Sequence, residues 1–386
     1  YQEYLDASSL EVKIHKLEEF ISLVPKHKAT EKIVAQNKSR LAKMKRELES
    51  QKQREKSIKK VISPFSIKKE GIQVILVSCF LNPGAGKTSI LNYLTKAAKE
   101  KIGKYTSLPE IGIYQYNKIR FQIVEMPSIK KGASEGVGNG KEILSQIRSC
   151  DLICFCIDLS QSIKEQMNLL LEEFSKADIR INIEPPPIII EKTGSNKIQV
   201  LYLTKEAKKA DELEEFTQNI KDIVLANGIR NAIVKIFGDI SFDNLLDSLS
   251  SSIVYKKAMI IATKGDLPNT EKKFKKLELN YSNKFNLIIG TSIQKGTFPD
   301  NFAKIVLKFL KKIRIYTMSS GGKIAEKPLL MNEHSCIKDV AIRIHKSFYE
   351  LFDHAIVIRE GDRQKRKRVG LDYLLIDKDI IEIHTT

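Results

Sequence analysis

The stretch "FLNPGAGKTS", residues 80–89, decides how the rest of the chain is interpreted. It follows the apolar run "IQVILVSCF" and precedes the helical pattern "KTSILNYLTKAAKE". This is the strand–loop–helix order in which a phosphate-binding loop G-x-x-x-x-G-K-[ST] works. The pattern is complete except at its first position, where Leu81 replaces glycine. The sequence therefore predicts a nucleotide site with one departure from the usual loop.

Each remaining part of the loop has a chemical role. Gly84 and Gly86 allow backbone N–H groups to converge on phosphate oxygens, and the helix that follows adds its positive end. Lys87 is predicted to reach the terminal phosphates, and the Thr88 hydroxyl to ligate Mg²⁺. If position 81 requires a positive φ, leucine costs about 1–2 kcal/mol there. The predicted phosphate-site residues are Leu81, Asn82, Pro83, Gly84, Ala85, Gly86, Lys87, Thr88 and Ser89.

Length and composition fit a folded protein of two or three domains, with 386 residues and 42% hydrophobic content. The five cysteines form no C-x-x-C pair, which indicates reduced core thiols in a cytoplasmic protein. Apolar runs stop near ten residues, so no membrane span is expected. No signal peptide is recognisable. The sequence begins with Tyr1 and not with methionine, which leaves open whether an N-terminal address precedes it.

The net charge of +18 attracts polyanions and so favours nucleic acid as a partner. A Lys- and Ile-rich composition that reflects codon usage is the alternative. Apolar residues recur at helical spacing over 10–24 and again over 34–48, with Pro25 between them, which predicts a helical hairpin. The basic second arm, "KSRLAKMKRELESQKQREKSIKK", either lies along RNA or is a solvated face.

From residue 71 onward the pattern is α/β. Strand-like runs "IQVILVSCF", "RFQIVEM", "DLICFCID", "KAMIIAT" and "FNLIIG" alternate with helical stretches, which predicts a mostly parallel sheet covered on both faces. "TKGD" at the end of one run resembles the guanine-reading motif [NT]-K-x-D, and "GTSI" after the next resembles the loop that closes over the base. ATP does not match this pair. The predicted base-site residues are Thr263, Lys264, Asp266, Thr291, Ser292 and Ile293.

The segment "EMPSIKKGASEGVGNGKEILSQIRSCDLICFCIDLS" resembles "DLPGIIEGAxxGxGxGxxxxxxxRxxDLIxxxxD" of the Obg-related GTPases, particularly the developmentally regulated GTP-binding proteins. Other parts of the chain also occur in the order of that family: "PKHKATE" before this segment, and "INIEPPPIII", "IRIYT" and a C-terminal TGS-like segment after it. The predicted fold is an α/β P-loop GTPase domain at 66–316, preceded by a basic helical hairpin at 1–65. It carries an inserted small α/β subdomain at about 160–252 and is followed by a β-grasp, TGS-like domain at 317–386.

The resemblance implies a GTP-hydrolysing switch that binds GTP or GDP with Mg²⁺ and associates with ribosomes or RNA in translation. It also implies a cytoplasmic, monomeric protein that could have a regulatory protein partner. By position, Glu125 replaces the aspartate that binds Mg²⁺ through water, and Thr106 or Ser107 is the hydroxyl that senses the γ-phosphate. Lys87 and Thr106 are the expected catalytic residues; Thr88, Thr106 and Glu125 are the expected metal site. The segment that begins at Glu125 is also expected to contact the nucleotide and is called the switch segment below; it comprises Glu125, Met126, Pro127, Ser128 and Ile129.

Several residues depart from the family pattern. Glu125 is one methylene longer than aspartate, and Ser128 replaces the glycine whose N–H meets the γ-phosphate. Ile129 stands where Ras-like GTPases have a catalytic glutamine, although an apolar residue is usual in this family. Some Obg-related proteins have an asparagine at the position of Gly84, and its side chain helps to hold K⁺. Glycine has no such side chain, which leaves potassium activation open. The alternative function is therefore an RNA- or ribosome-binding module whose degenerate nucleotide site does not hydrolyse GTP. A kinase explains neither "TKGD" nor the C-terminal segment.

Four smaller features of the sequence remain. The insertion could instead be a lengthened surface crossover. In the C-terminal segment, Ser335 is expected to cap a helix, and "HAIVI" and "DIIEIH" are strand-like. The run "RQKRKR" at 363–368 either meets RNA phosphates or is a solvated loop. His345 has no ligand partner nearby, so a structural role is expected and no metal cluster is assigned.

Overall fold

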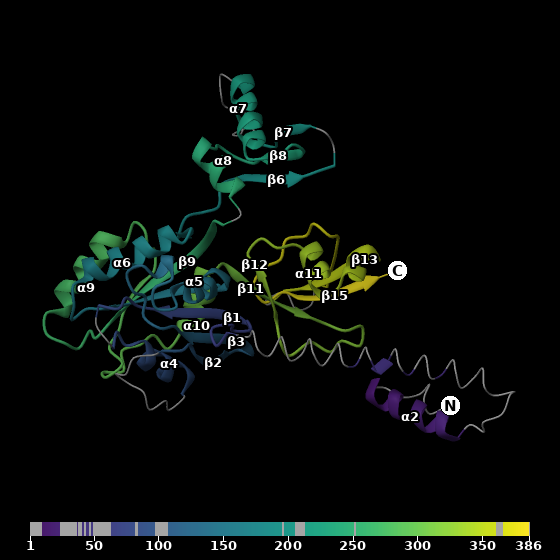
Figure 1. Cartoon of the computed structure of the whole chain (residues 1–386), viewed down its shortest axis with the longest axis horizontal. Helices are drawn as coiled ribbons and strands as arrows, with labels where there is room; N and C mark the ends of the chain where they lie inside the picture. Colours follow the sequence, from purple (N-terminus) through teal and green to yellow (C-terminus); the bar gives the residue numbers. More distant parts are fainter. Residues whose placement is uncertain are drawn as a thin grey trace. The chain divides into compact units, whose positions relative to one another are not determined.

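The computed structural model describes residues 10–23, 37, 41, 44–45, 48, 63–81, 84–96, 107–194, 197–204, 213–250, 252–359 and 366–385. The chain divides into two compact units, residues 1–66 and 67–386 (Figure 1). In the first unit, helix α2 (Leu10–Leu23) buries Ile14 and Leu17 in one cluster with Met44. The Lys45 ammonium also pairs with Glu18 at 2.6 Å. The apolar positions predicted for the two arms thus meet, and most of the basic second arm lies outside the described residues.

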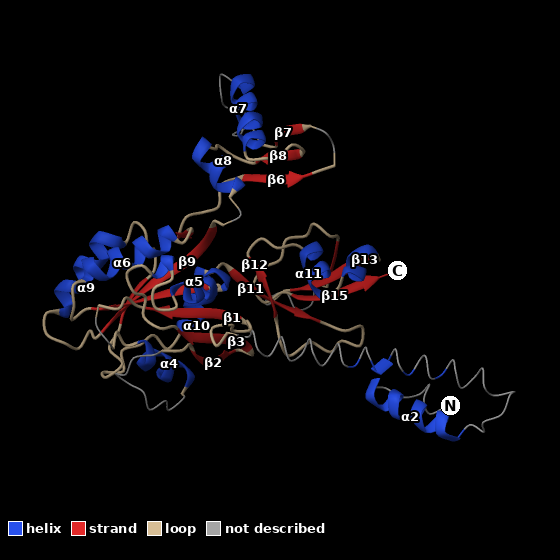
Figure 2. Cartoon of the chain, viewed as in Figure 1, coloured by secondary structure: helices blue, strands red, loops and turns tan. Residues whose placement is uncertain are grey.

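The second unit is built on a mixed sheet in the order β10-β9-β4-β1-β3-β2 (Figure 2). Strand β5 pairs with the first three residues of β9. Every neighbouring pair is parallel except β2 with β3. The predicted runs are all strands; the β2 edge strand and the short β5 were not predicted. The bounds are β1 Ile72–Val77, β2 Glu110–Tyr116, β3 Ile119–Glu125, β4 Leu152–Asp158, β5 Ile179–Ile181, β9 Val254–Thr263 and β10 Ile288–Gly290.

Alternation along the strands places side chains on two faces, and each face is covered. On one face, Val74 and Leu76 of β1 pack with Leu91 of α4 (Lys87–Thr95) and Val306 of α10 (Phe302–Phe309). On the other face, the Phe155 ring of β4 contacts Phe174 of α6 (Ile163–Lys176) at a centroid distance of 5.2 Å. Helices α5 (Gly140–Ser149) and α9 (Thr270–Tyr281) complete the domain. Such covering explains why β1 and β4 are continuous apolar runs.

The insertion is an independent α/β layer, as predicted, and not a lengthened crossover. Its three-stranded sheet has the order β6-β8-β7, formed by β6 Ile188–Lys192, β8 Ala232–Ile236 and β7 Ile198–Tyr202. One face packs on α7 (Leu213–Ala226) and α8 (Phe242–Leu249) through a separate cluster that includes Ile220, Val234 and Leu245. The predicted span of about 160–252 also takes in α6 and β5, but these two elements belong to the main domain.

The C-terminal segment forms a five-stranded sheet in the order β12-β11-β15-β13-β14, with helices α11 (Ile337–Ile344) and α12 (Lys346–Glu350). The strands are β11 Lys312–Thr317, β12 Leu329–Asn332, β13 Phe352–Ile358, β14 Lys367–Val369 and β15 Ile380–Thr385. Strand β11 belongs to this sheet, so the predicted boundary at 316–317 falls within a strand. Residues 363–365 of the basic run lie outside the described residues.

The expected cap of α11 is one residue out. Cys336, not Ser335, is the N-cap, and the Asp339 carboxylate accepts the Cys336 N–H at 2.9 Å. Ile337, Val340 and Ala341 are buried below it as expected. His345 ends this helix and its Nδ1 contacts the Ser347 hydroxyl, in keeping with a structural role.

The five cysteines are all free, and four of them are buried. Burial raises the pKa of the Cys150 and Cys156 thiols to about 12, so both stay protonated at neutral pH. Among the described helices, none combines the length and the apolar character that crossing a bilayer requires.

The packing predicts a large difference between two identical substitutions. Leu76→Ala in the fully buried β1 should lower the free energy of unfolding by about 2–5 kcal/mol, because it leaves a cavity. Leu279→Ala in α9, where the side chain is 79% exposed, should change it by less than about 0.5 kcal/mol. Urea-induced unfolding of both variants measures this difference, and equal midpoints would contradict the assigned core.

Candidate nucleotide-binding site

The predicted site segments meet at one edge of the main sheet. The phosphate loop follows β1, the segment from Glu125 ends β3, "TKGD" ends β9 and "GTSI" follows β10. These strands are parallel, so their carboxyl ends lie on the same side, where ligands bind in open α/β sheets.

The phosphate loop has the backbone that its glycines predict. Gly84 and Gly86 have φ of 89° and 83°, a left-handed conformation that glycine adopts without strain. Leu81 is not among the described non-glycine residues with positive φ, so the anticipated strain at this position does not arise. Its side chain is 42% exposed. Ala85 is buried and Ser89 half-buried, whereas Asn82 and Pro83 lie outside the described residues.

Lys87 is the electrostatic centre of the loop. Its side chain is almost completely buried, and its ammonium donates to the hydroxyls of Ser78 at 2.5 Å and Ser128 at 3.0 Å. Burial lowers the pKa of Lys87, and the negative charge of Glu125 opposes this effect. Among the described residues, the hydrogen-bond acceptors of this buried ammonium are neutral hydroxyls, and a charged acceptor such as phosphate would form the stronger bond.

Thr88 and Glu125 form the part of the site that fits a metal ion. The Thr88 hydroxyl donates to Glu125 Oε1 at 2.9 Å, and both residues are buried. Hard oxygen atoms are the ligands that Mg²⁺ prefers, whether they bind it directly or through water. The longer glutamate side chain therefore still reaches the threonine, and these two residues would hold the ion.

The switch segment is fixed to β1 at both of its ends. The Met126 N–H donates to the Leu76 carbonyl at 3.1 Å, and the Ile129 N–H to that of Ser78 at 2.8 Å. The side chains of Met126 and Ile129 are fully buried, and Pro127 lies between them. Only Ser128 turns its hydroxyl towards Lys87. Ile129 therefore belongs to the core and brings no group that could position water.

The base-site residues are held in place by separate hydrogen bonds and one ion pair, together called the base-site network. Thr263 donates to the Ala85 carbonyl at 3.0 Å and so joins this network to the phosphate loop. Asp266 accepts from the Ser292 hydroxyl at 2.6 Å, and this bond lowers the pKa of its carboxyl. The half-buried carboxylate is thus ionised, as a group that reads the donor edge of guanine must be. Lys264, with φ of 60°, pairs with Asp158 at 2.7 Å.

The structure describes most of the remaining predicted residues but not all of them. Thr291 and Ser292 are buried, and Ile293 is half-buried against the main core. Thr106 lies outside the described residues, whereas Ser107, its alternative, is described and exposed. The choice between these two hydroxyls therefore stays a prediction. Within the described residues, no group of three or more His, Cys, Asp or Glu side chains is placed to hold a metal.

Three residues that sequence reasoning missed hold the site together: Ser78, Asp158 and Glu173. Ser78 directly follows β1, and Asp158 is the last residue of β4. Their positions at the carboxyl ends of these strands could have indicated their role. Glu173, near the end of α6, had no signal in the sequence.

Glu173 anchors the turn at Gly132–Ser134, which follows the switch segment and is called the switch turn. Its buried carboxylate accepts from the backbone N–H groups of Gly132 at 2.7 Å and Ser134 at 2.8 Å, and from the Ser134 hydroxyl at 2.7 Å. Burial by itself raises the pKa of Glu173, but the bonds from Ser134 and Gly132 together outweigh it and hold the pKa below its ordinary value. The short helix η1 (Ala133–Glu135) is therefore tied to α6.

The glycine run after this turn has separate structural reasons. Gly136 and Gly138 have positive φ, at 113° and 63°. Gly140 has a different constraint, because a Cβ there would lie 2.1 Å from the Ala133 carbonyl oxygen. A side chain at position 140 would push η1 away from the start of α5.

This fold and site define a P-loop GTPase with a C-terminal TGS domain. The model of the family described as "50S ribosome-binding GTPase" matches residues 80–192, and the TGS-domain model matches residues 313–385. The GTP-binding protein MJ1326 of Methanocaldococcus jannaschii is 31% identical over 386 residues, which covers 98% of this chain and 93% of that protein. Ribosome-interacting GTPase 1 of Saccharomyces cerevisiae is 26% identical and covers 96% of this chain and 98% of its own length.

Developmentally-regulated GTP-binding protein 1 of Xenopus laevis is also 26% identical, over 96% of this chain and 98% of its own. The chain belongs to this family of GTP-binding proteins. The family resemblance and the fold class predicted from the sequence are both confirmed.

The base-site network predicts a change of specificity. Asp266→Asn should weaken GTP binding by about 10- to 150-fold, because a charged acceptor is lost. It should also relax discrimination against xanthine nucleotides, because the amide offers a donor. Fluorescent-nucleotide titration measures both affinities, with Asp300→Asn at an exposed position as control. Unchanged affinities for both bases would show that Asp266 does not read guanine.

The Glu173 anchor predicts a local loosening without loss of the fold. Glu173→Gln should speed amide hydrogen exchange at Gly132 and Ser134 by about 10- to 150-fold, because charge-assisted bonds become neutral ones. The matched control is Glu172→Gln, which removes a neighbouring carboxylate that pairs with Lys176 on the surface. Equal exchange in the two variants would rule out the anchor.

Proposed function

We propose that the protein is a GTP-hydrolysing switch that uses Mg²⁺ and acts on ribosomes or RNA in translation. The observation that supports this most directly is the contact between the Lys87 ammonium and the Ser128 hydroxyl. Lys87, the residue that would bind the terminal phosphates, is thus hydrogen-bonded to Ser128 of the switch segment. Arrival or loss of the γ-phosphate must change what Lys87 holds, and hence the position of Ser128.

In this proposal the residues of the site divide the work. Lys87 exchanges its two serine hydroxyls for phosphate oxygens, and Thr88 with Glu125 holds Mg²⁺, which would neutralise charge on the phosphates. Asp266 selects guanine. Ile129 is fully buried where a water-positioning side chain would be needed. Intrinsic hydrolysis should therefore be slow, and a partner that supplies the missing group could raise the rate by about 10³- to 10⁵-fold.

The partner is proposed from the relatives and from charge. One full-length relative is a ribosome-interacting GTPase, and the matching family model is described as a ribosome-binding GTPase. The net charge of +18 favours a polyanion such as ribosomal RNA. A cytoplasmic location, a monomeric state and a regulatory protein partner remain part of the same proposal.

A second function is supported by the same contact. Ser128 stands where the family has a glycine, and its hydroxyl together with that of Ser78 accepts hydrogen bonds from Lys87. A γ-phosphate would have to displace both hydroxyls, so the same contact fits a ribosome- or RNA-binding module that no longer hydrolyses GTP. The two functions differ in whether nucleotide changes ribosome affinity.

Ser128→Gly separates these functions. The glycine frees the backbone to turn towards the γ-phosphate, so it should increase the ratio of ribosome affinities between a non-hydrolysable GTP analogue and GDP. Co-sedimentation with ribosomes in both nucleotides and without nucleotide measures this ratio, and Lys87→Ala is the control that should remove nucleotide dependence. Single-turnover hydrolysis with and without ribosomes completes the test. If the parent binds ribosomes equally in all three states and shows only background hydrolysis, the binding module is the better conclusion.

A further inference from the structure

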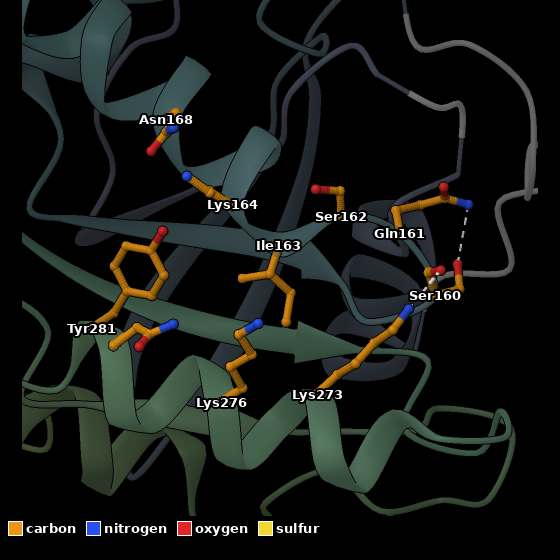
Figure 3. Close-up of a pocket in the computed structure, with 10 residues that line it drawn as sticks. Ser160, Gln161, Ser162, Ile163, Lys164, Asn168, Lys273, Lys276 and Tyr281 are labelled. Carbon is orange, nitrogen blue, oxygen red and sulfur yellow. Dashed lines mark hydrogen bonds between the residues drawn. The ribbon is translucent and has the colours of Figure 1, made fainter.

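A pocket of about 780 Å³ lies between the start of α6 and the length of α9. Figure 3 shows Lys273, Lys276 and Tyr281 extending from α9 towards α6, where Lys164 and Asn168 face them. None of the nucleotide-site residues predicted from the sequence lines this pocket. It is therefore a separate feature that the GTPase cycle does not explain.

The pocket concentrates positive charge. Lys164, Lys273 and Lys276 line it, and no acidic residue does. Lys273 donates to the Ser160 carbonyl at 3.0 Å, which fixes its ammonium in the wall. Lys164 and Lys276 are exposed, and in the described part of the chain no salt bridge engages either of them. An anion entering here would meet ammonium groups that no carboxylate neutralises.

Two lysines of the same helices that lie outside the pocket are paired. On α9 itself, Lys275 pairs with Glu271 at 3.0 Å, and at the other end of α6 Lys176 pairs with Glu172 at 2.7 Å. Lys164 and Lys276 inside the pocket have no such partner in the described part of the chain, and neither has Lys272 outside it. The N-terminus of α6, capped by Ser162, adds its positive end on the same side.

The uncharged groups narrow the kind of anion. Asn168 and Asn280 supply amide donors and acceptors, and Tyr281 supplies a half-buried aromatic ring. Burial raises the pKa of Tyr281, so its hydroxyl stays a neutral donor at neutral pH. Amides read base edges and ribose hydroxyls, and aromatic rings stack on unpaired bases. An acidic peptide would use the lysines but not these groups.

We propose that this pocket binds the backbone of single-stranded RNA, with phosphates on Lys164 and Lys276 and an unpaired base or ribose against Asn168, Asn280 and Tyr281. The site adds a direct RNA contact within the GTPase domain itself. It does not depend on hydrolysis, since none of its groups belongs to the phosphate or metal site.

The test compares two double variants with the same change of charge. Lys164→Ala/Lys276→Ala removes the two unpaired lysines of the pocket, whereas Lys272→Ala/Lys275→Ala removes two exposed lysines of α9 that do not line it. The probe is a fluorescent single-stranded RNA of mixed sequence, titrated by anisotropy at several salt concentrations. Each phosphate contact with a single strand contributes about 0.7 to the slope of log affinity against log salt.

Loss of two contacts should therefore reduce the slope by about 1.4, which corresponds to about 25-fold weaker binding at 0.1 M salt relative to a 1 M reference. The control double variant should change both quantities far less, and Lys164→Arg/Lys276→Arg should retain RNA binding. GTP affinity should be the same in all variants, so failure here is distinguishable from failure of the proposed switch.

Three results would overturn the proposal. Equal losses in the two alanine double variants would mean that RNA responds to overall charge alone. Undetectable binding of the RNA by the parent at low salt would remove the ligand. Displacement by a polyglutamate peptide as effective as displacement by unlabelled RNA of equal charge would assign the pocket to acidic protein segments.

Discussion

The buried ammonium of Lys87 is the constraint on which the site depends. Removing a charge from water costs several kcal/mol unless polar partners replace the solvent. Here the partners are two hydroxyls, one at the exit of β1 and one beyond β3, together with the field of Glu125. That arrangement is available only because β1 and β3 are parallel neighbours whose carboxyl ends meet. The sheet order and the chemistry of the loop are thus two aspects of one requirement.

The departures from the usual motif act at different levels. Leu81 changes only a surface position, because the backbone there needs no left-handed conformation. Glu125 keeps its contact with Thr88 in spite of its extra methylene. Ser128 is different, since its hydroxyl adds a bond to the lysine that glycine could not make. Of the three, only Ser128 alters what the phosphate must displace.

Much of this could be predicted from the sequence because local patterns report local physics. Apolar runs gave the strands of the sheet, and the motif after β1 gave the backbone of the loop from Gly84 to Thr88. The role of Asp266 as the residue that reads guanine stays a prediction. What could not be predicted depends on contacts between distant segments. Glu173 lies 39 residues from Ser134 and meets it only after α6 packs on the sheet. Serine is the better N-cap by propensity, so Ser335 was expected. Helix α11 begins after Cys336 instead, where the Asp339 carboxylate accepts the Cys336 N–H.

Helix α6 joins two features that were described apart. It begins at the lysine-lined pocket and ends near Glu173, the anchor of the switch turn, and its 14 residues span about 21 Å. Its first turn is held to β4 by the Gln166 side chain, which accepts from the Asp158 N–H at 2.9 Å, and its last turn by the Phe174–Phe155 contact. A helix fixed to one strand at both ends keeps those ends at a constant separation. RNA bound at the start of α6 would therefore rest on the same rigid element that positions Gly132 and Ser134, without any direct contact with the nucleotide.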